Sequence, residues 1–312
     1  MNSELWWRKR AGCAHKLLLG SFANGMGRFD RVEPRLAAAV QDILARPGSL
    51  VRAVIAYLIG IELGVPEAAA RAMACGIEYL HTASLVFDDL PAMDDARLRR
   101  GASCVHVVHG ECLAMLAALA MINRAYAMIW QGIRNSNPQR RAAAGDWVDG
   151  RLGIGGVIGG QAYDLSGWRG GQSAAEVSEV AARKTGDLLR LALVLPAIAG
   201  RGTPREIQIL DRLALLRGLA YQAADDLKDV ISPEEDSGKS AGRDEALGRP
   251  NLVMAEGLPA ALRRFRRLSD TGDRVQAALP GSSERWQMLD LLKVPLPVSP
   301  ARIESTKLSA AV

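Results

Sequence analysis

The sequence predicts an all-α fold in a single domain, and three observations support that prediction. Apolar residues recur with the period of an α-helix through most of the chain, and no β-branched runs alternate with turns at regular spacing. Ala and Leu are abundant whereas aromatic residues make up only 5% of the chain, which is typical of an aliphatic helical core. With 312 residues and 49% hydrophobic content, the chain can bury a substantial core.

The predicted helices follow one another with short interruptions. The first begins near Pro34, where Leu36, Val40 and Leu44 lie at i, i+4 and i+8, and it ends at Pro47. Further helical patterns cover residues 50–63, 66–89, 110–133, 139–165, 174–199, 204–230, 250–268 and 284–293.

A glycine-rich segment, residues 150–161, lies within one of these patterns. It follows no predicted strand and lacks the GxGxxG spacing of a dinucleotide-binding loop. We therefore interpret Gly156 and Gly160 as positions where helices pack closely.

Residues 1–30 and 295–312 are expected to be tails on either side of a helical domain at 31–294. The first tail is basic and lacks the apolar region and cleavage site of a secretory signal. No stretch of about 20 uninterrupted apolar residues occurs, so no membrane span is expected. Trp6 and Trp7, beside basic residues, leave contact with a membrane surface open.

The net charge of the chain and the spacing of its cysteines argue against several classes of function. The formal net charge of +5 suits an anionic ligand but is too diffuse to indicate nucleic acid. The cysteines show no CxxC spacing, which argues against a zinc site or a disulfide framework and favours the cytoplasm. They are Cys13, Cys75, Cys104 and Cys112.

Two clusters of aspartates each follow an apolar helical pattern. In "SLVFDDLPAMDDARLRRG" (84–101), Asp88 and Asp94 are six residues apart and would lie on different faces of a continuous helix. Pro91 lies between them, so we expect the chain to leave the helix there and bring Asp94 back towards Asp88. In "YQAADDLKDV" (221–230), Asp225 and Asp229 are four apart and share one helix face.

Carboxylates at two helix ends, without neighbouring His or Cys ligands, suit a hard cation that prefers oxygen. Mg²⁺ fits best, because it commonly binds one or two carboxylates and completes its coordination with water and phosphate oxygens. Two solvated acidic helix ends are the alternative, although acidic groups at helix C-termini oppose the helix dipole. Nearby basic residues are candidate diphosphate ligands: Arg99, Arg100, Lys184, Lys239 and Arg249.

The order of these motifs resembles that of the trans-isoprenyl diphosphate synthase family, and most closely that of bacterial geranylgeranyl diphosphate synthases of the carotenoid type. "HTASLVFDDLPAMDDARLRRG" and "YQAADDLKD" are similar to the family's two aspartate-rich motifs. Between them, "GGQAYDL" and "RKTGDLL" are similar to its GQxxDL and KT signatures, and "SGKSAGRDEALGR" follows the second motif. The resemblance covers residues 36–258 and implies a helical bundle around a central cavity, and a homodimer.

The resemblance implies a role for each matching residue. Six aspartates would bind Mg²⁺ ions that bridge the diphosphate of an allylic substrate: Asp88, Asp89, Asp94, Asp225, Asp226 and Asp229. The basic residues Arg99, Lys184 and Lys239 would grip that diphosphate. The diphosphate of isopentenyl diphosphate would be held by Arg52, His81 and Arg100, with Ser49 beside them, and the space where the allylic cation forms would be lined by Thr185 and Gln222.

The implied reaction is a prenyl transfer. The allylic C–O bond ionises, the double bond of isopentenyl diphosphate attacks the carbocation, and a proton is lost. Ala83, five residues before Asp88, would help form the floor of the elongation pocket, with Ser84 next to it. Both side chains are small, so we expect a product of twenty carbons.

One segment departs from the family pattern. The family usually has GKxxRP where this chain has "GSLVRA" (48–53), so Ser49 replaces a lysine and Ala53 a proline. Arg46 is three residues away and could supply the missing charge.

Three alternative functions stay open. The chain could be a farnesyl diphosphate synthase, which makes a shorter product, or a non-catalytic regulatory partner subunit of a prenyl synthase. A class I terpene cyclase would need an NSE-like second motif, whereas this chain has "DDLKD" (225–229).

Overall fold

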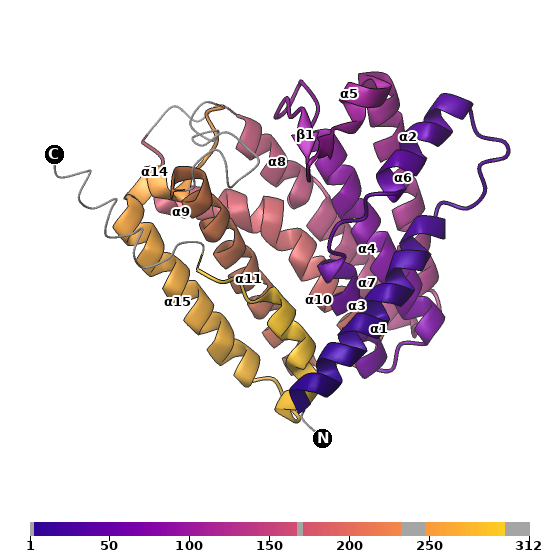
Figure 1. Cartoon of the computed structure of the whole chain (residues 1–312). Helices are drawn as coiled ribbons and strands as arrows, with labels where there is room; N and C mark the ends of the chain where they lie inside the picture. The colour runs from indigo at the N-terminus through magenta and orange to yellow at the C-terminus, as the bar shows by residue number, and fades with distance from the viewer. Residues whose placement is uncertain (1–2, 167–170, 232–246, 297–312) are drawn as a thin grey trace.

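The computed structural model describes residues 3–166, 171–231 and 247–296, and it is a bundle of helices (Figure 1). The α-helices are α1 (Ser3–Asn24), α2 (Pro34–Leu44), α3 (Val51–Glu62), α4 (Glu67–Asp88), α5 (Val105–His109), α6 (Glu111–Ile133), α7 (Pro138–Leu152), α8 (Val157–Leu165), α9 (Ala174–Ala181), α10 (Asp187–Ala199), α11 (Pro204–Ile231), α14 (Leu252–Glu256) and α15 (Leu258–Ala277). A π-helix, η1 (Ala182–Gly186), joins α9 to α10, and a 3₁₀-helix, η2 (Ser283–Leu292), follows α15.

The described strands form one short antiparallel hairpin. Strand β1 (Leu98–Arg99) pairs with β2 (Ala102–Ser103), with Leu98 opposite Ser103. The prediction of an all-α fold is therefore confirmed.

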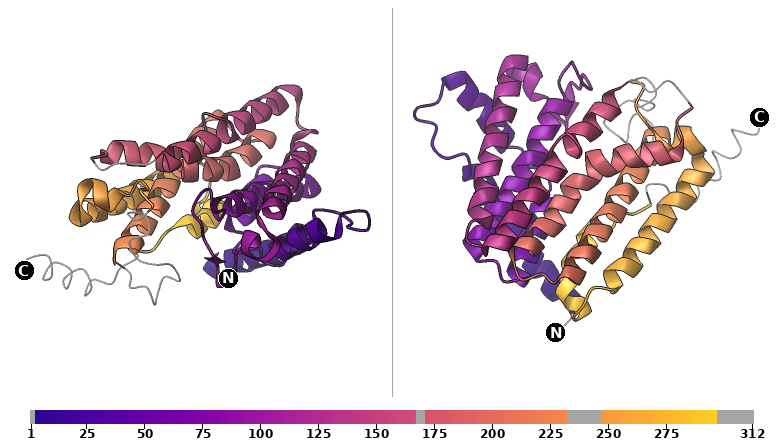
Figure 2. Two further views of the ribbon diagram at one scale, coloured as in Figure 1. Left: turned by 90° about the horizontal axis from the view of Figure 1, so that it is seen from above. Right: turned by 180° about the vertical axis from the view of Figure 1, so that it is seen from behind.

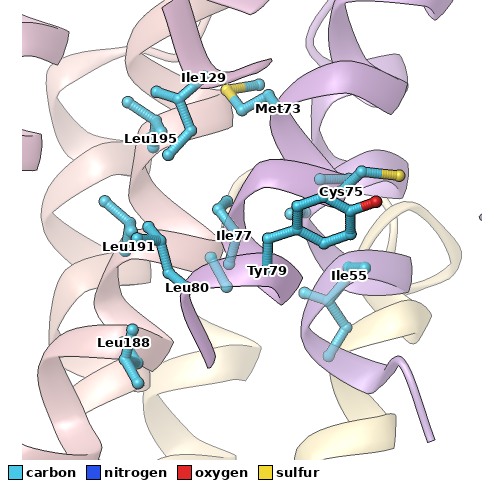
Figure 3. Packing of buried hydrophobic residues seen from close by; sticks show 14 of the residues in the cluster. Ile55, Met73, Cys75, Ile77, Tyr79, Leu80, Ile129, Leu188, Leu191 and Leu195 are labelled. Carbon is cyan, nitrogen blue, oxygen red and sulfur yellow. The ribbon is translucent and has the colours of Figure 1, made fainter. Parts of the chain in front are cut away.

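Helix α4 lies at the centre of the larger hydrophobic core, where it packs against α3, α6 and α10. Figure 3 shows Ile77 and Leu80 of α4 close to Leu191 of α10. Leu191 and Leu195 are one turn apart on α10 and are fully buried. This contact fixes α4, which carries the first aspartate cluster at its C-terminal end.

A second core cluster joins α11 to α14 and α15. Leu227 of α11 is buried together with Leu252 of α14 and Phe265 of α15. This packing fixes the part of α11 that carries the second aspartate cluster.

The expectation that residues 1–30 form a tail is wrong, because residues 3–24 form α1 and pack into the core. Ala14, Leu18 and Phe22 repeat every four residues and are buried. The ring of Phe22 meets that of Tyr79 edge-on, with centroids 4.9 Å apart, and the Tyr79 hydroxyl donates to the Phe22 carbonyl at 2.6 Å. The sequence did not predict this helix, because part of its buried face consists of small alanines between charged residues, which give only a weak apolar periodicity.

Other boundaries differ in detail. The pattern at 139–165 is two helices, α7 and α8, because the chain turns between Gly153 and Gly156. Helix α15 continues to Ala277, nine residues past the predicted end at 268. The expected C-terminal tail lies almost wholly in residues 297–312, outside the described residues.

One described helix, α6, is long and apolar enough to cross a membrane by length and composition alone. It packs along α4 as part of the bundle, and 39% of its most apolar window is buried. Core helices of water-soluble bundles have the same length and composition, so these properties alone do not indicate a span.

Both aspartate clusters lie near one end of the bundle. Figures 1 and 2 show β1, which follows α4, at the same end of the bundle as α8. Residues from these segments meet in the site described next.

Candidate active site

The first aspartate cluster forms a tight turn at the end of α4. Asp88 is the last residue of the helix, and the Asp94 backbone N–H donates to the Asp88 carbonyl at 2.9 Å. The Ala96 N–H donates to the Asp89 carbonyl at 3.1 Å. The chain leaves the helix at Asp88, three residues before Pro91, and the predicted return of Asp94 towards Asp88 is confirmed.

Asp89 faces the protein rather than the open end of the site. Its carboxylate accepts from Arg99 Nε at 2.7 Å and from Arg99 Nη2 at 2.6 Å, and the residue is 3% exposed. Burial opposes the charge of Arg99, but Asp89 outweighs it, so the pKa of Arg99 is raised. This bidentate pair ties the β1–β2 hairpin to the end of α4.

Asp88 lies among both donors and other carboxylates. The Gln161 side-chain amide donates to Asp88 Oδ1 at 2.7 Å. Burial raises the pKa of Asp88 to about 6; Lys184 opposes this shift and the neighbouring Asp94 adds to it. An unpaired negative charge is therefore costly at this position, and a cationic ligand would relieve that cost.

Two basic side chains from later segments of the chain, Lys184 and Arg249, lie close to the first aspartate cluster. Lys184 Nζ lies 2.5 Å from Asp164 Oδ2. Burial lowers the pKa of Lys184, but the negative charges of Asp164 and Asp88 outweigh burial, so the pKa of Lys184 is raised. Arg249 Nη2 donates to Asp94 Oδ1 at 2.8 Å and to the Met93 carbonyl at 2.9 Å. Arg249 thus joins the chain after α11 to the turn after α4.

The second aspartate cluster lies in the last turns of α11. Asp226 is 1% exposed, and its carboxylate accepts from Gln222 Nε2 at 2.8 Å and from the Leu252 backbone N–H at 2.8 Å. Asp225 is exposed and Asp229 is half-buried. Asp226 therefore anchors α14 to α11, and the other two share an adjacent, more open face.

Thr185 and Gln222 lie together, as their shared predicted role requires. The Thr185 hydroxyl donates to Gln222 Oε1 at 3.0 Å, which links η1 to α11. Thr185 and Lys184 both lie in the π-helical turn, a departure from regular helix that is common at functional sites.

Two glycines allow helices to approach this turn. A Cβ at Gly160 would come within 2.5 Å of the Lys184 backbone nitrogen, so α8 packs directly on η1, as predicted for a closely packed glycine. At Gly156 the tight contact is with the Arg151 carbonyl of the preceding helix instead.

A separate basic cluster lies at the start of α3. Arg52 Nη1 is 3.1 Å from His81 Nε2 of α4. Gly48 has φ +71°, a backbone conformation that favours glycine, and the Arg100 guanidinium lies directly over it. Arg52, His81 and Arg100 therefore come together beside Ser49.

The surroundings of His81 favour its neutral form. Burial, followed by the charges of Arg52 and Arg100, lowers the pKa of His81 well below its usual value. A neutral imidazole can still donate one hydrogen bond to a phosphate oxygen.

Arg46 does not face this cluster. Its Nη1 donates to the Ser103 carbonyl at 2.9 Å, its Nε donates to the Asp42 carbonyl at 3.2 Å, and its Nη2 pairs with the Asp42 carboxylate. The idea that Arg46 replaces the lysine missing at Ser49 has no support in this geometry.

Ala83 and Ser84, the two residues expected to limit the length of the product, lie on different faces of α4. His81, Ser84 and Asp88 lie along one half-exposed stripe of α4, and the Ser84 hydroxyl donates to the His81 carbonyl at 2.8 Å. Ala83 is fully buried in the core. Ser84 is therefore the one that shares the face of the first aspartate.

Sequence reasoning left Gln161, Asp164 and Glu78 without a role. The GQxxDL spacing could have identified the first two, because it places Gln161 and Asp164 on one face of a helix. Lys239 lies outside the described residues. Within residues 3–166, 171–231 and 247–296, no three His, Cys, Asp or Glu side chains already converge as a metal site.

Residues 33–274 match the Polyprenyl synthetase family. The chain belongs to this family. It is 34% identical over 238 residues to "Geranylgeranyl pyrophosphate synthase 9, chloroplastic" of Arabidopsis thaliana, covering 73% of this chain and 66% of that protein. It is 33% identical to "Geranylgeranyl pyrophosphate synthase, chloroplastic" of Capsicum annuum, covering 72% and 61%. The chain thus spans just under two thirds of the length of these relatives.

Solved structures share the fold of this polyprenyl synthetase. Geranylgeranyl pyrophosphate synthetase from Pyrococcus horikoshii has a TM-score of 0.77 at 21% identity, covering 92% of this chain and 98% of that chain. A Helicobacter pylori geranyltransferase complexed with magnesium and isoprenyl diphosphate has a TM-score of 0.78 at 24% identity, covering 91% and 95%. These similarities establish the isoprenoid synthase fold.

Proposed function

We propose that this polyprenyl synthetase is a Mg²⁺-dependent geranylgeranyl diphosphate synthase. It condenses isopentenyl diphosphate with dimethylallyl, geranyl and farnesyl diphosphates and releases a product of twenty carbons. The observation that carries the proposal is the convergence of two aspartate clusters and two basic groups on one end of the bundle, through contacts among α4, α8, η1 and α11. The named relatives agree with this assignment.

The donor set fits magnesium. Asp88, Asp94, Asp225 and Asp229 supply hard oxygen ligands, and their small number leaves room for water and diphosphate oxygens. Bound Mg²⁺ would supply positive charge that stabilises the departing diphosphate. Asp89 and Asp226, which the sequence also suggested as ligands, hold Arg99 and α14 in place instead.

The chain's own residues would divide the remaining work. Lys184 and Arg99, with Lys239, bind the allylic diphosphate, and Arg249 adds a further charge beside Asp94. Arg52, His81 and Arg100 orient isopentenyl diphosphate, so that its double bond meets the allylic carbon. Thr185 and Gln222 line the space where the cation forms, and their uncharged oxygens suit a positive centre.

The active form would be a homodimer in the cytoplasm. Leu116, Leu119, Tyr126 and Trp130 form an exposed apolar stripe along α6, with Trp130 56% exposed. A contiguous apolar stripe of this kind marks an interface, and a second copy can cover it symmetrically. All four cysteines are free thiols, in keeping with a reducing compartment. Sedimentation of the wild type and of Leu119→Glu tests the dimer.

The test of function is product analysis. The purified protein is incubated with Mg²⁺, labelled isopentenyl diphosphate and each allylic diphosphate, and the products are identified by chromatography. Geranylgeranyl diphosphate supports the proposal. Farnesyl diphosphate as the final product indicates the shorter-chain synthase, a cyclic hydrocarbon indicates a cyclase, and absence of any product indicates a regulatory subunit.

A further inference from the structure

Helix α3 begins without a cap of its own. Its N-cap residue, Leu50, has a left-handed backbone with φ +52° and no side-chain hydrogen bond to the first turn. The first-turn N–H groups of a helix need outside acceptors. One acceptor comes from α4, because the Glu78 carboxylate accepts from the Ala53 backbone N–H at 3.3 Å.

Glu78 is an unusual residue to find there. It is 2% exposed, and burial raises the pKa of its carboxyl while the charges of Arg52 and Arg100 lower it. A buried carboxylate is costly unless a positive group offsets it. The prenyl-transfer mechanism above uses no acid at this position.

The surroundings of Glu78 connect it to the basic cluster at the start of α3. Glu78 and His81 are three residues apart on α4 and so lie on one face. Arg52, next to Ala53, reaches the His81 ring at 3.1 Å, and Arg52 Nε and His81 Nδ1 are buried with no hydrogen-bond partner within the described residues. Glu78 thus fixes the backbone next to Arg52 through the Ala53 N–H, while Arg52 Nε remains able to donate to a ligand.

We propose that Glu78 is a positioning residue for isopentenyl diphosphate: it fixes the first turn of α3 and the Arg52 guanidinium where the diphosphate binds. The inference rests on the proposed function. The backbone contact depends on a departure of this chain, because the family's usual proline has no N–H to donate where Ala53 stands.

The first experiment compares Glu78→Gln with a matched control, Glu206→Gln. The Glu78→Gln substitution keeps the size of the side chain, but it weakens the acceptor of the Ala53 N–H and removes the negative charge that attracts the Arg52 guanidinium. Glu206 is 3% exposed and accepts from the Thr203 backbone N–H at 2.8 Å at the start of α11, so it is a buried helix cap outside the basic cluster. We expect Glu78→Gln to raise the KM for isopentenyl diphosphate about fivefold or more, leave the KM for farnesyl diphosphate within about twofold, and leave kcat nearly unchanged. Glu206→Gln should change neither KM.

The second experiment is a double-mutant cycle with Arg52→Ala. If Glu78 acts through Arg52, then Glu78→Gln in the Arg52→Ala background should add less than about a twofold change. Equal and independent effects on KM in both backgrounds would overturn the proposal. A loss of thermal stability with both KM values unchanged would do the same, because it assigns Glu78 a purely structural role.

Calorimetric titration of isopentenyl diphosphate alone separates this inference from the proposed function. A wild type that binds no isopentenyl diphosphate contradicts the proposed function itself. A wild type and a Glu78→Gln variant that bind it equally well contradict only the role of Glu78. We expect the variant to bind about fivefold or more weakly than the wild type, in line with its KM.

Discussion

The two aspartate clusters share one design and differ in how they are held. In each adjacent pair the second aspartate turns into the protein: Asp89 binds Arg99, and Asp226 binds Gln222 and the Leu252 N–H. The first cluster breaks its helix and folds back, whereas the second remains in the regular helix α11.

Their charge environments also differ. Asp88 and Asp94 are already contacted by Gln161 and Arg249, and Lys184 lies nearby. Asp225, in contrast, is exposed to solvent. The first cluster is thus assembled by the protein before any ligand arrives, and the second presents its carboxylate on an open helix face. A cationic ligand must compete with Arg249 at the first cluster but not at Asp225.

The largest expected effect comes from the carboxylates that we propose to bind Mg²⁺. Asp88→Ala or Asp225→Ala should lower turnover by about a hundredfold or more. Each substitution removes a proposed ligand of Mg²⁺, and the charge of Mg²⁺ would stabilise the departing diphosphate. Helix content by circular dichroism should be unchanged. Full activity of the wild type in EDTA would contradict the metal dependence on which this prediction depends.

Asp226→Asn provides the contrast within the second cluster. Its side chain accepts two protein hydrogen bonds in the core, so its loss should reduce the free energy of unfolding by about 1–3 kcal/mol. Urea titration measures this change. If Asp225→Ala and Asp226→Asn destabilise the fold equally, the division into an open and an anchoring aspartate is wrong.

The length of the product tests whether the growing chain runs along the half-exposed stripe of α4 formed by His81, Ser84 and Asp88. An aromatic ring on the Asp88 face of α4 should block a growing chain near fifteen carbons, so Ser84→Tyr should shift the main product from geranylgeranyl to farnesyl diphosphate. Ala83→Tyr should shift it in the same direction, but because Ala83 is fully buried, overpacking should also cost about 1–3 kcal/mol of stability. Chromatography of the products and thermal melts separate the two effects. A wild type that stops at farnesyl diphosphate would contradict this view of the pocket.

A smaller effect is expected in the basic cluster beside the first aspartates. Ser49→Lys should lower the KM for isopentenyl diphosphate by about tenfold or more, since a charged hydrogen bond contributes roughly 1.5–3 kcal/mol. The KM for the allylic substrate should stay nearly constant, and the gain should shrink as salt rises. Arg46→Ala is the control, and because Arg46 is bound to Asp42 and Ser103, it should leave the KM unchanged. A rise in KM with Arg46→Ala and no gain with Ser49→Lys would show that Arg46 already fills the role.

Much of this architecture could be predicted from the sequence, and the exceptions have physical causes. Strong apolar periodicity predicted α2, α3 and α4, and Pro91 predicted the turn that returns Asp94 to Asp88. The inward direction of Asp89 and Asp226 could not be predicted, because it depends on donors that tertiary packing brings from other segments.

Burial was equally hard to foresee at charged positions. Glu78 lies in an apolar helical pattern where a carboxylate predicts an exposed face, yet it is buried because Arg52 and the start of α3 pack against it. Only the tertiary structure reveals such a compensating group, since nothing in the spacing of Arg52 and Glu78, 26 residues apart, indicates contact.

The smallest predicted effect is a pH-dependent gain in stability when Asp88 loses its charge. The pKa of Asp88 is raised to about 6 from its usual 3.8, so the folded state binds more protons than the unfolded state between these values. Its charge therefore destabilises the fold above about pH 6 and has no effect below about pH 4, where both states are protonated. In EDTA at pH 7.5, Asp88→Asn should raise the free energy of unfolding by on the order of 1 kcal/mol, after allowance for solvent screening, or the Tm by about 2 °C. Gln161 can still donate to the side-chain amide oxygen of the Asp88→Asn variant, so the contact itself survives. At pH 4 the gain should vanish, and Asp225→Asn, at an exposed position, should change the Tm little at either pH. A gain for Asp88→Asn that is the same at pH 4 and pH 7.5 would show that the crowding at the first cluster is steric rather than electrostatic.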